Sequence, residues 1–224
     1  MAQMKNPLLN FHRETLVDRL VQLLQESIYS GKYPPQMMIS EAGVSKEFGV
    51  SRVPAREALQ RLEEMNLIRK NHLRREIVKL SLEEFAQIYE LKNVVEAFGA
   101  MKGSLAASPQ EIEAIREVFN QTEQAIFRGD MNQLQYLNQS FHESLVFCCK
   151  NKKLIDTFLS LVKQVRWTTS LALKLTERPP QSNQEHRKIF DAFQERKADE
   201  VRALIESHTN AHMKRVLAQM ESWE

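Results

Sequence analysis

The sequence predicts a mostly α-helical protein, in which an N-terminal winged helix-turn-helix is followed by an antiparallel all-helical bundle. The composition is one reason, because only 6 Gly and 7 Pro occur among 224 residues and helix-breaking residues are therefore scarce. The second reason is the hydrophobic periodicity, which is helical except in one stretch near residue 70 that indicates two short strands. A helix-start signal at Ser81 divides the chain into expected domains of residues 1–80 and 81–224.

The overall composition favours a cytoplasmic protein without a membrane partner. The N-terminus has no apolar core of signal-peptide length, and no apolar run approaches the ~18 residues that a membrane span requires. Cys148 and Cys149 are adjacent, where a mutual disulfide is geometrically poor. The net charge is only +2, but the basic excess lies in residues 1–80. This asymmetry supports a nucleic-acid partner without establishing one.

The first expected elements are a supporting helix and a short helix that leads into a tight turn. Residues 12–30 place leucines and an isoleucine at helical spacing, and Gly31 follows as the end of this helix. Residues 32–39 contain two prolines and predict an extended connection. Ser40 is then expected to cap a short helix that ends at Gly49.

The next helix is expected to begin after Ser51, whose side chain can accept hydrogen bonds from the free backbone N–H groups of the first turn. Pro54 falls within that first turn, where proline is tolerated. One face of this helix is apolar, and the other carries Arg52, Val53 and Arg56. Two helices joined by a glycine-containing turn, with arginines at the start of the second, are typical of a DNA-binding helix-turn-helix.

The side chains of the second helix suit DNA recognition. Arginine can donate two hydrogen bonds to guanine O6 and N7 in the major groove, and a serine at a helix start can bind a phosphate. The alternative is an amphipathic hairpin whose arginines are merely solvated, but the glycine turn, Ser51 and the pair Arg52 and Arg56 together favour DNA binding.

Residues 68–80 predict a two-stranded wing around a polar turn. Its cations suit contacts to phosphates or to the minor groove, although each of them could equally be a solvated surface charge. They are Arg69, Lys70, Arg74, Arg75 and Lys79.

The stretch SRVPAREALQRLEEMNLI, residues 51–68, resembles the recognition helix of GntR-type transcriptional regulators, whose usual form is SRxPxREALxxLxxxGLV. The resemblance implies a homodimer that binds double-stranded DNA at a pseudo-palindromic operator. Base contacts would come from Arg52, Val53 and Arg56, a phosphate contact from Ser51, and wing contacts from Arg74 and Arg75. Arg75 replaces the usual glycine of the wing, and Asn66 replaces the glycine that ends the recognition helix.

Residues 81–224 predict a series of helices and no strand. Ser81 with Glu84, and Ser108 with Glu111, have the spacing of capping boxes, and Pro109 stands at the first helical position. The expected helices span about 82–107, 109–128, 131–149, 152–176, 181–196 and 198–221, with Pro179 and Pro180 as one of the separators.

Four polar residues of this region form a candidate metal site: Asn138, His142, His186 and His208. They match the ligand-binding (FCD) domain of the FadR branch of the same family, where an Asp, a His four residues later and two further histidines often hold a metal. Asn138 stands in place of that Asp, which implies a weaker site for Zn²⁺ or Ni²⁺. Without the resemblance, histidines on separate helices are more often core or surface residues. His212, one turn beyond His208, could substitute as a ligand, but the expectation is that it faces solvent.

Two cations, Lys92 and Arg166, are candidates for binding an acidic small-molecule effector in the same domain. Each could equally be a helix-surface cation with a neighbour one turn away. The alternative function is a helical metalloenzyme or a metal-binding protein without specific DNA recognition. No HExxH arrangement, glycine-rich phosphate loop or nucleophile motif accompanies the histidines, so we expect that the protein is not an enzyme.

Overall fold

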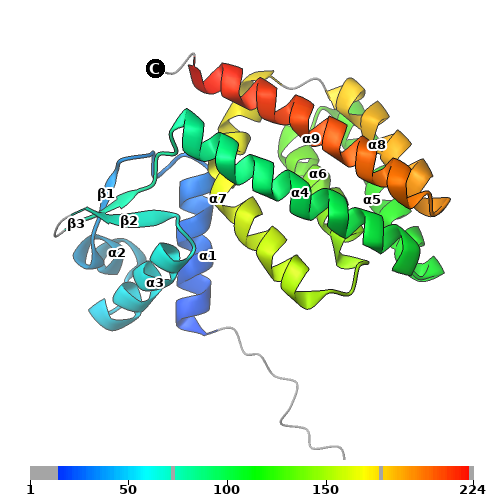
Figure 1. The fold of residues 1–224 in the computed structure, drawn as a ribbon. Helices are drawn as coiled ribbons and strands as arrows, with labels where there is room; N and C mark the ends of the chain where they lie inside the picture. The colour runs from blue at the N-terminus through cyan, green and yellow to red at the C-terminus, as the bar shows by residue number, and fades with distance from the viewer. Residues whose placement is uncertain (1–14, 72–73, 177–178, 222–224) are drawn as a thin grey trace, which may run out of the picture. The chain divides into compact units, whose positions relative to one another are not determined.

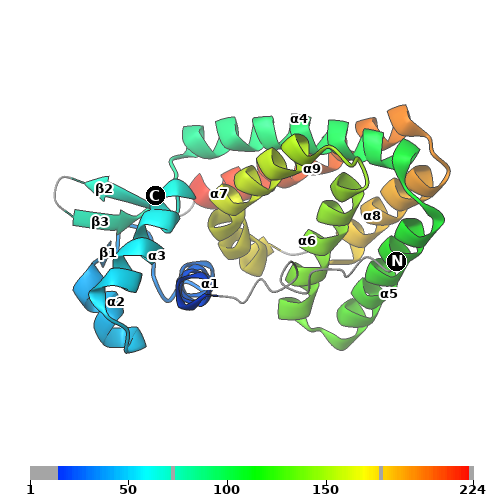
Figure 2. The same cartoon turned by 90° about the horizontal axis from the view of Figure 1, so that it is seen from below.

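The computed structural model describes residues 15–71, 74–176 and 179–221, and it divides into two compact units (Figures 1 and 2). The first unit runs to Val78, and the second begins at Lys79. The expected domain boundary, between residues 80 and 81, lies two residues beyond this division. Each unit has its own buried core.

Over its described residues, the N-terminal unit contains three helices and a small sheet. In chain order its elements are α1 (Leu16–Tyr29), β1 (Met38–Ile39), α2 (Glu41–Phe48), α3 (Arg52–Glu64), β2 (Ile68–Asn71) and β3 (Arg74–Ile77). Buried leucines of α1 and α3 form its core, with Val44 of α2 and the isoleucines of the two longer strands. The start expected at residue 12 is wrong, because a capping box between Thr15 and Asp18 begins α1 at Leu16; residues 12–14 lie outside the described part of the chain.

The turn between α2 and α3 is built as the sequence predicts, except at Ser51. Gly49 ends α2 with a left-handed backbone (φ 66°), and the Ser40 hydroxyl caps α2 by accepting from Gly43 N. Ser51 occupies the N-cap position of α3, but its side chain makes no capping hydrogen bond. The expected cap is therefore wrong. A physical reason is Pro54 at the third helical position, which has no N–H to donate.

The three strands form an antiparallel sheet in the order β1-β3-β2. The predicted wing is confirmed as β2 and β3, with Lys70 opposite Arg75. Sequence reasoning missed β1, because two residues are too few to show an alternating pattern and their partner strand lies far along the chain. The Asn66 backbone is left-handed (φ 55°), as expected for a residue that replaces glycine after a helix.

The C-terminal unit is all-helical over its described residues. Its helices are α4 (Leu82–Ala106), α5 (Pro109–Arg128), α6 (Met131–Phe147), α7 (Lys152–Thr176), α8 (Pro179–Gln194) and α9 (Ala198–Glu221). Both predicted capping boxes are confirmed, and Pro109 occupies the first turn of α5. Pro179 does not separate two helices as expected; it begins α8, because a helix start needs no N–H at that position.

Helices α4 and α9 lie side by side in both views, and α6, α7 and α8 pack against this pair (Figures 1 and 2). One core cluster joins α4, α5, α6, α8 and α9, and it includes the fully buried rings of Phe141 and Phe193. None of the helices in the described ranges is both long and apolar enough to span a membrane.

Close packing of α4 against α6 depends on Gly103. A Cβ at this position would lie 2.2 Å from the carbonyl oxygen of Leu145, so one helix must shift to admit it. We expect Gly103→Ala to lower the free energy of unfolding by about 1–3 kcal/mol, because the clash outweighs the roughly 1 kcal/mol gain in helix propensity. Urea denaturation measures this. Lys102→Ala, at the exposed neighbouring position, is the control, and an equally stable Gly103→Ala would contradict the packing argument.

Candidate metal centre and nucleic-acid interface

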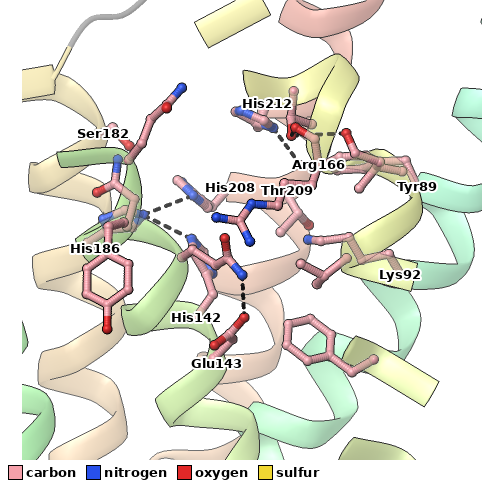
Figure 3. A pocket seen from close by; sticks show the side chains of 18 residues that line it. Tyr89, Lys92, His142, Glu143, Arg166, Ser182, His186, His208, Thr209 and His212 are labelled. Atoms are coloured by element: carbon pink, nitrogen blue, oxygen red, sulfur yellow. Dashed lines mark hydrogen bonds between the residues drawn. The ribbon is translucent and has the colours of Figure 1, made fainter. Parts of the chain in front are cut away.

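Three imidazole rings converge inside the C-terminal unit (Figure 3). His142 comes from α6, His186 from α8 and His208 from α9. The Nε2 atom of His186 lies 3.1 Å from Nε2 of His142 and 3.1 Å from Nε2 of His208. One ligand atom from each ring falls within 4.8 Å of the others. The structure therefore brings together the three histidines that the sequence singled out.

Two of the three nitrogen–nitrogen spacings fit a divalent metal. Two imidazole nitrogens at about 2.0–2.1 Å from one ion lie about 2.9–3.4 Å apart for coordination angles between octahedral and tetrahedral. The observed 3.1 Å separations fall within that range. Imidazole nitrogens suit Zn²⁺ and Ni²⁺, and three ligands leave open positions for water or a carboxylate.

Two carboxylates lie against the outer imidazoles, and the one from Glu185 makes a hydrogen bond. Glu96 Oε1 lies 2.5 Å from Nδ1 of His142, and Glu185 Oε2 lies 2.6 Å from Nδ1 of His208. A carboxylate beside Nδ1 favours the tautomer with its proton there, which leaves the Nε2 lone pair for a metal. Sequence reasoning missed both residues. Glu185 follows no ligand-spacing rule, and Glu96 lies on a different helix from the histidine that it contacts.

Burial favours the neutral, metal-ligating form of His186 and His208. Burial, reinforced by the neighbouring imidazoles, lowers the pKa of His186 well below its usual value. Burial also lowers the pKa of His208, although Glu185 opposes this shift. Because both pKa values lie below the ordinary value of about 6.5, these rings are uncharged at neutral pH.

Glu96 is a fully buried carboxylate that is paired on two sides. Lys92 Nζ lies 2.5 Å from Glu96 Oε2, one helical turn away on α4, while His142 contacts the other oxygen. Burial opposes charge on both partners, but the attraction outweighs it: the pKa of Glu96 is lowered and that of Lys92 is raised. The pair is therefore ionised at neutral pH, and it ties Lys92 to the histidine cluster.

A cavity of about 230 Å³ opens beside the histidines. Besides the three rings, its lining includes the remaining candidates from the sequence, Lys92, Asn138 and Arg166. His212 also lines it, and its Nδ1 lies 2.5 Å from the hydroxyl of Tyr89 (Figure 3). The expectation that His212 faces solvent is therefore wrong, because one further turn along α9 keeps this ring on the side of the cavity.

The N-terminal unit presents its candidate DNA contacts on exposed positions of α3 and the wing. Ser51, Arg52, Val53 and Arg74 are exposed. A hollow lies between α2, the start of α3 and the wing. Its lining includes cations from α3 and from the wing, among them Arg52 and Arg74.

Two of the candidate arginines are engaged within the unit. Arg56 Nε donates to Glu41 Oε1 at 3.1 Å, although more than half of the Arg56 side chain is exposed. Arg75 is 20% exposed and pairs with both Glu63 and Glu41. Its direct role in DNA binding stays a prediction.

Comparison with known proteins gives the same division of the chain. The profile of the bacterial regulatory proteins of the gntR family matches residues 16–78, and that of the FCD domain matches residues 87–211. The chain is 27% identical over 199 residues to the uncharacterized HTH-type transcriptional regulator YdhC of Bacillus subtilis, covering 87% of this chain and 89% of YdhC. It is 26% identical over 191 residues to the Nta operon transcriptional regulator of Aminobacter aminovorans, covering 83% and 87%.

A solved structure shares this fold. E. coli McbR/YncC superposes with a TM-score of 0.80 at 16% identity, covering 92% of this chain and 99% of that protein. The likeness supports the arrangement of a helix-turn-helix followed by a helical domain.

Asn138 offers a direct test of the metal centre, because it lines the cavity one turn before His142. We expect Asn138→Asp to bind Zn²⁺ or Ni²⁺ about tenfold more tightly or better, since an anionic oxygen joins three neutral imidazoles. Competition with a chromophoric chelator measures the change. Asn120→Asp, on an exposed position of α5, adds the same charge outside the cavity and should leave affinity unchanged. Equal affinities for Asn138→Asp and the parent would exclude position 138 from the coordination sphere.

Proposed function

This chain belongs to the GntR family of bacterial regulatory proteins and carries an FCD domain, and we propose that an acidic small molecule controls its affinity for DNA. It is a transcriptional regulator with a DNA-binding helix-turn-helix. The observation that carries the proposal is the convergence of three buried imidazoles beside a cavity lined by Lys92 and Arg166.

The N-terminal unit would read DNA with the start of α3. The exposed side chains of Arg52, Val53 and Arg56 would enter the major groove, where arginine recognises guanine and a valine methyl group can contact thymine. Ser51 supports a phosphate contact, because its hydroxyl is exposed and makes no cap hydrogen bond. The wing cations, Arg74 foremost, would bind the DNA backbone or the minor groove.

The C-terminal unit would hold a divalent metal through Nε2 of His142, His186 and His208, with Asn138 as a fourth candidate ligand. A bound metal supplies a Lewis acid that can accept a carboxylate oxygen in an open position. The protein's own part would be to keep His186 and His208 neutral by burial, and to set the carboxylates of Glu96 and Glu185 beside the outer imidazoles. Lys92 and Arg166 add positive charge to the cavity, which suits an anionic ligand.

Control of DNA binding requires two arrangements of the protein that differ in affinity for the ligand. We expect a two-fold dimer, and helix α4 offers a surface for it. Leu91, Val94, Phe98 and Leu105 recur on one side of α4, and each is between 40% and 61% exposed. Leu91 and Leu105 stand seven residues on either side of Phe98. If a second copy of α4 packs antiparallel across Phe98, Leu91 of one copy therefore lies opposite Leu105 of the other.

The dimer surface predicts a clear effect for Phe98→Glu. A charge at the centre of the stripe should convert the dimer to a monomer, and affinity for a palindromic operator should fall at least tenfold because one half-site is lost. Sedimentation equilibrium and operator titration measure the two effects. Phe127→Glu is the matched control, since Phe127 is 93% exposed on α5, outside the stripe. A dimeric Phe98→Glu protein would place the interface elsewhere.

The experiment that tests the proposed function is a screen of small carboxylic acids against metal-loaded protein, read by the change in affinity for a selected operator. We expect at least one acid to change that affinity by about 5–150-fold, the usual range of allosteric coupling. His186→Ala should remove the response and keep DNA binding, because His186 lies in the C-terminal unit.

Lys188→Ala, an exposed position on the same helix, is the control for the screen and should respond like the parent. An unchanged response in His186→Ala would contradict the metal-centred mechanism. Loss of operator binding in this variant without ligand would contradict the separation of roles.

A further inference from the structure

One carboxylate of the N-terminal unit is shared by two arginines that come from different elements. Glu41 is the first residue of α2, and its side chain is 24% exposed. Its Oε1 atom accepts from Arg56 Nε of α3 at 3.1 Å and from Arg75 Nη1 of β3 at 3.3 Å. A single oxygen therefore joins the recognition helix to the wing.

The chain of contacts continues to a second acid. Arg75 Nε donates to Glu63 Oε1 at 2.6 Å, and Glu63 lies near the end of α3. Arg75 is thus held between α2 and α3 by two carboxylates. Because Glu41 and Glu63 both contact Arg75, the wing strand that carries it is fixed to both helices of the helix-turn-helix.

The contact with Glu41 also determines which edge of Arg56 is presented outward. Glu41 occupies Nε, and within the described residues neither Nη atom of Arg56 donates a hydrogen bond. A guanidinium held at Nε offers its two Nη donors end-on, which is an orientation that matches the O6 and N7 acceptors of guanine. Holding the fork in place also reduces the side-chain entropy that binding would otherwise remove.

We propose that Glu41 is a positioning residue for DNA recognition, which aims the fork of Arg56 at one base and holds the wing through Arg75. The inference rests on the proposed role of Arg56 as a base-reading residue. A carboxylate near DNA repels phosphates and weakens binding to every sequence. Glu41 would therefore exchange some general affinity for selectivity at the base that Arg56 reads.

Two simpler roles of Glu41 would have different consequences. As an acid in the first turn of α2, it also stabilises the helix through the backbone dipole. A helix-stabilising residue changes thermal stability without changing base preference. A bulk negative charge changes affinity for all sequences by the same factor. Only a positioning role makes the effect of Glu41 depend on the presence of Arg56.

The test is selection from a random double-stranded DNA pool at fixed salt, with parent, Glu41→Gln, Arg56→Ala and the double variant. We expect Glu41→Gln to reduce base preference at one position in each half-site about tenfold, while affinity for random DNA rises. Arg56→Ala should lose preference at the same position. The double variant should lose no more there than Arg56→Ala does, because the two residues act as a unit.

Two variants serve as controls. Glu64→Gln removes the same charge from an exposed position of α3 and should keep the parent's preference at every position. Glu63→Gln loosens Arg75 from α3 but leaves the contact between Glu41 and Arg56, so it should keep the preference at the Arg56 position. Thermal unfolding of each variant separates loss of fold from loss of selectivity. If Glu41→Gln fails to fold, the base preference at the position read by Arg56 is compared between Glu63→Gln and Arg56→Ala. An equal loss of this preference in the two variants would contradict the proposal.

Two results would overturn the inference. One is a parent-like preference in folded Glu41→Gln with tighter binding to all sequences, because this is the behaviour of bulk charge alone. The other is a further loss in the double variant beyond Arg56→Ala. If the parent itself enriches no sequence, the proposed DNA reading fails first. If the parent selects a site and only the Glu41 effect is absent, the proposed function stands and this inference fails.

Discussion

The buried charge of Glu96 is the interaction on which the C-terminal unit depends. A carboxylate without solvent is unfavourable unless it is paired, and removing one partner of a buried ion pair costs about 3–5 kcal/mol. Glu96 meets this requirement with Lys92 on its own helix and His142 on α6. The same contacts hold an imidazole in the orientation that a metal needs. Stability of the unit and geometry of the candidate site therefore rest on one side chain.

Close packing places these groups within reach of each other. A Cβ at Gly103 would clash with the backbone of α6, and one at Gly99 would press on side chains of α6 and α7, so both helices lie close to α4 at these positions. Nδ1 of His142 then lies 2.5 Å from Oε1 of Glu96, and the Lys92 side chain lines the neighbouring cavity. In the N-terminal unit a shared carboxylate has a comparable role, because Glu41 pairs with both Arg56 and Arg75. In both units an acid orients the residues that we propose to bind the partner.

Local chemistry explains what the sequence predicts well. Ser81 and Ser108 each form a capping box with a glutamate only three residues further along the chain. Gly49 ends a helix because glycine readily adopts the left-handed backbone. Family resemblance predicts that the three histidines share a site, and the structure brings them together. Glu96, Glu185 and the inward position of His212 could not be predicted, because they depend on how separate helices pack. The short strand β1 exists only through its pairing with β3.

The most direct test of the central claim is X-ray absorption spectroscopy of the desalted protein after loading with Zn²⁺ or Ni²⁺. The account predicts about one ion per chain, with a first shell that includes three imidazole nitrogens at about 2.0–2.1 Å. Multiple scattering from the rings identifies them as imidazoles. A protein that retains no metal, or a spectrum without imidazole scattering, would contradict the claim that these three histidines form a metal centre.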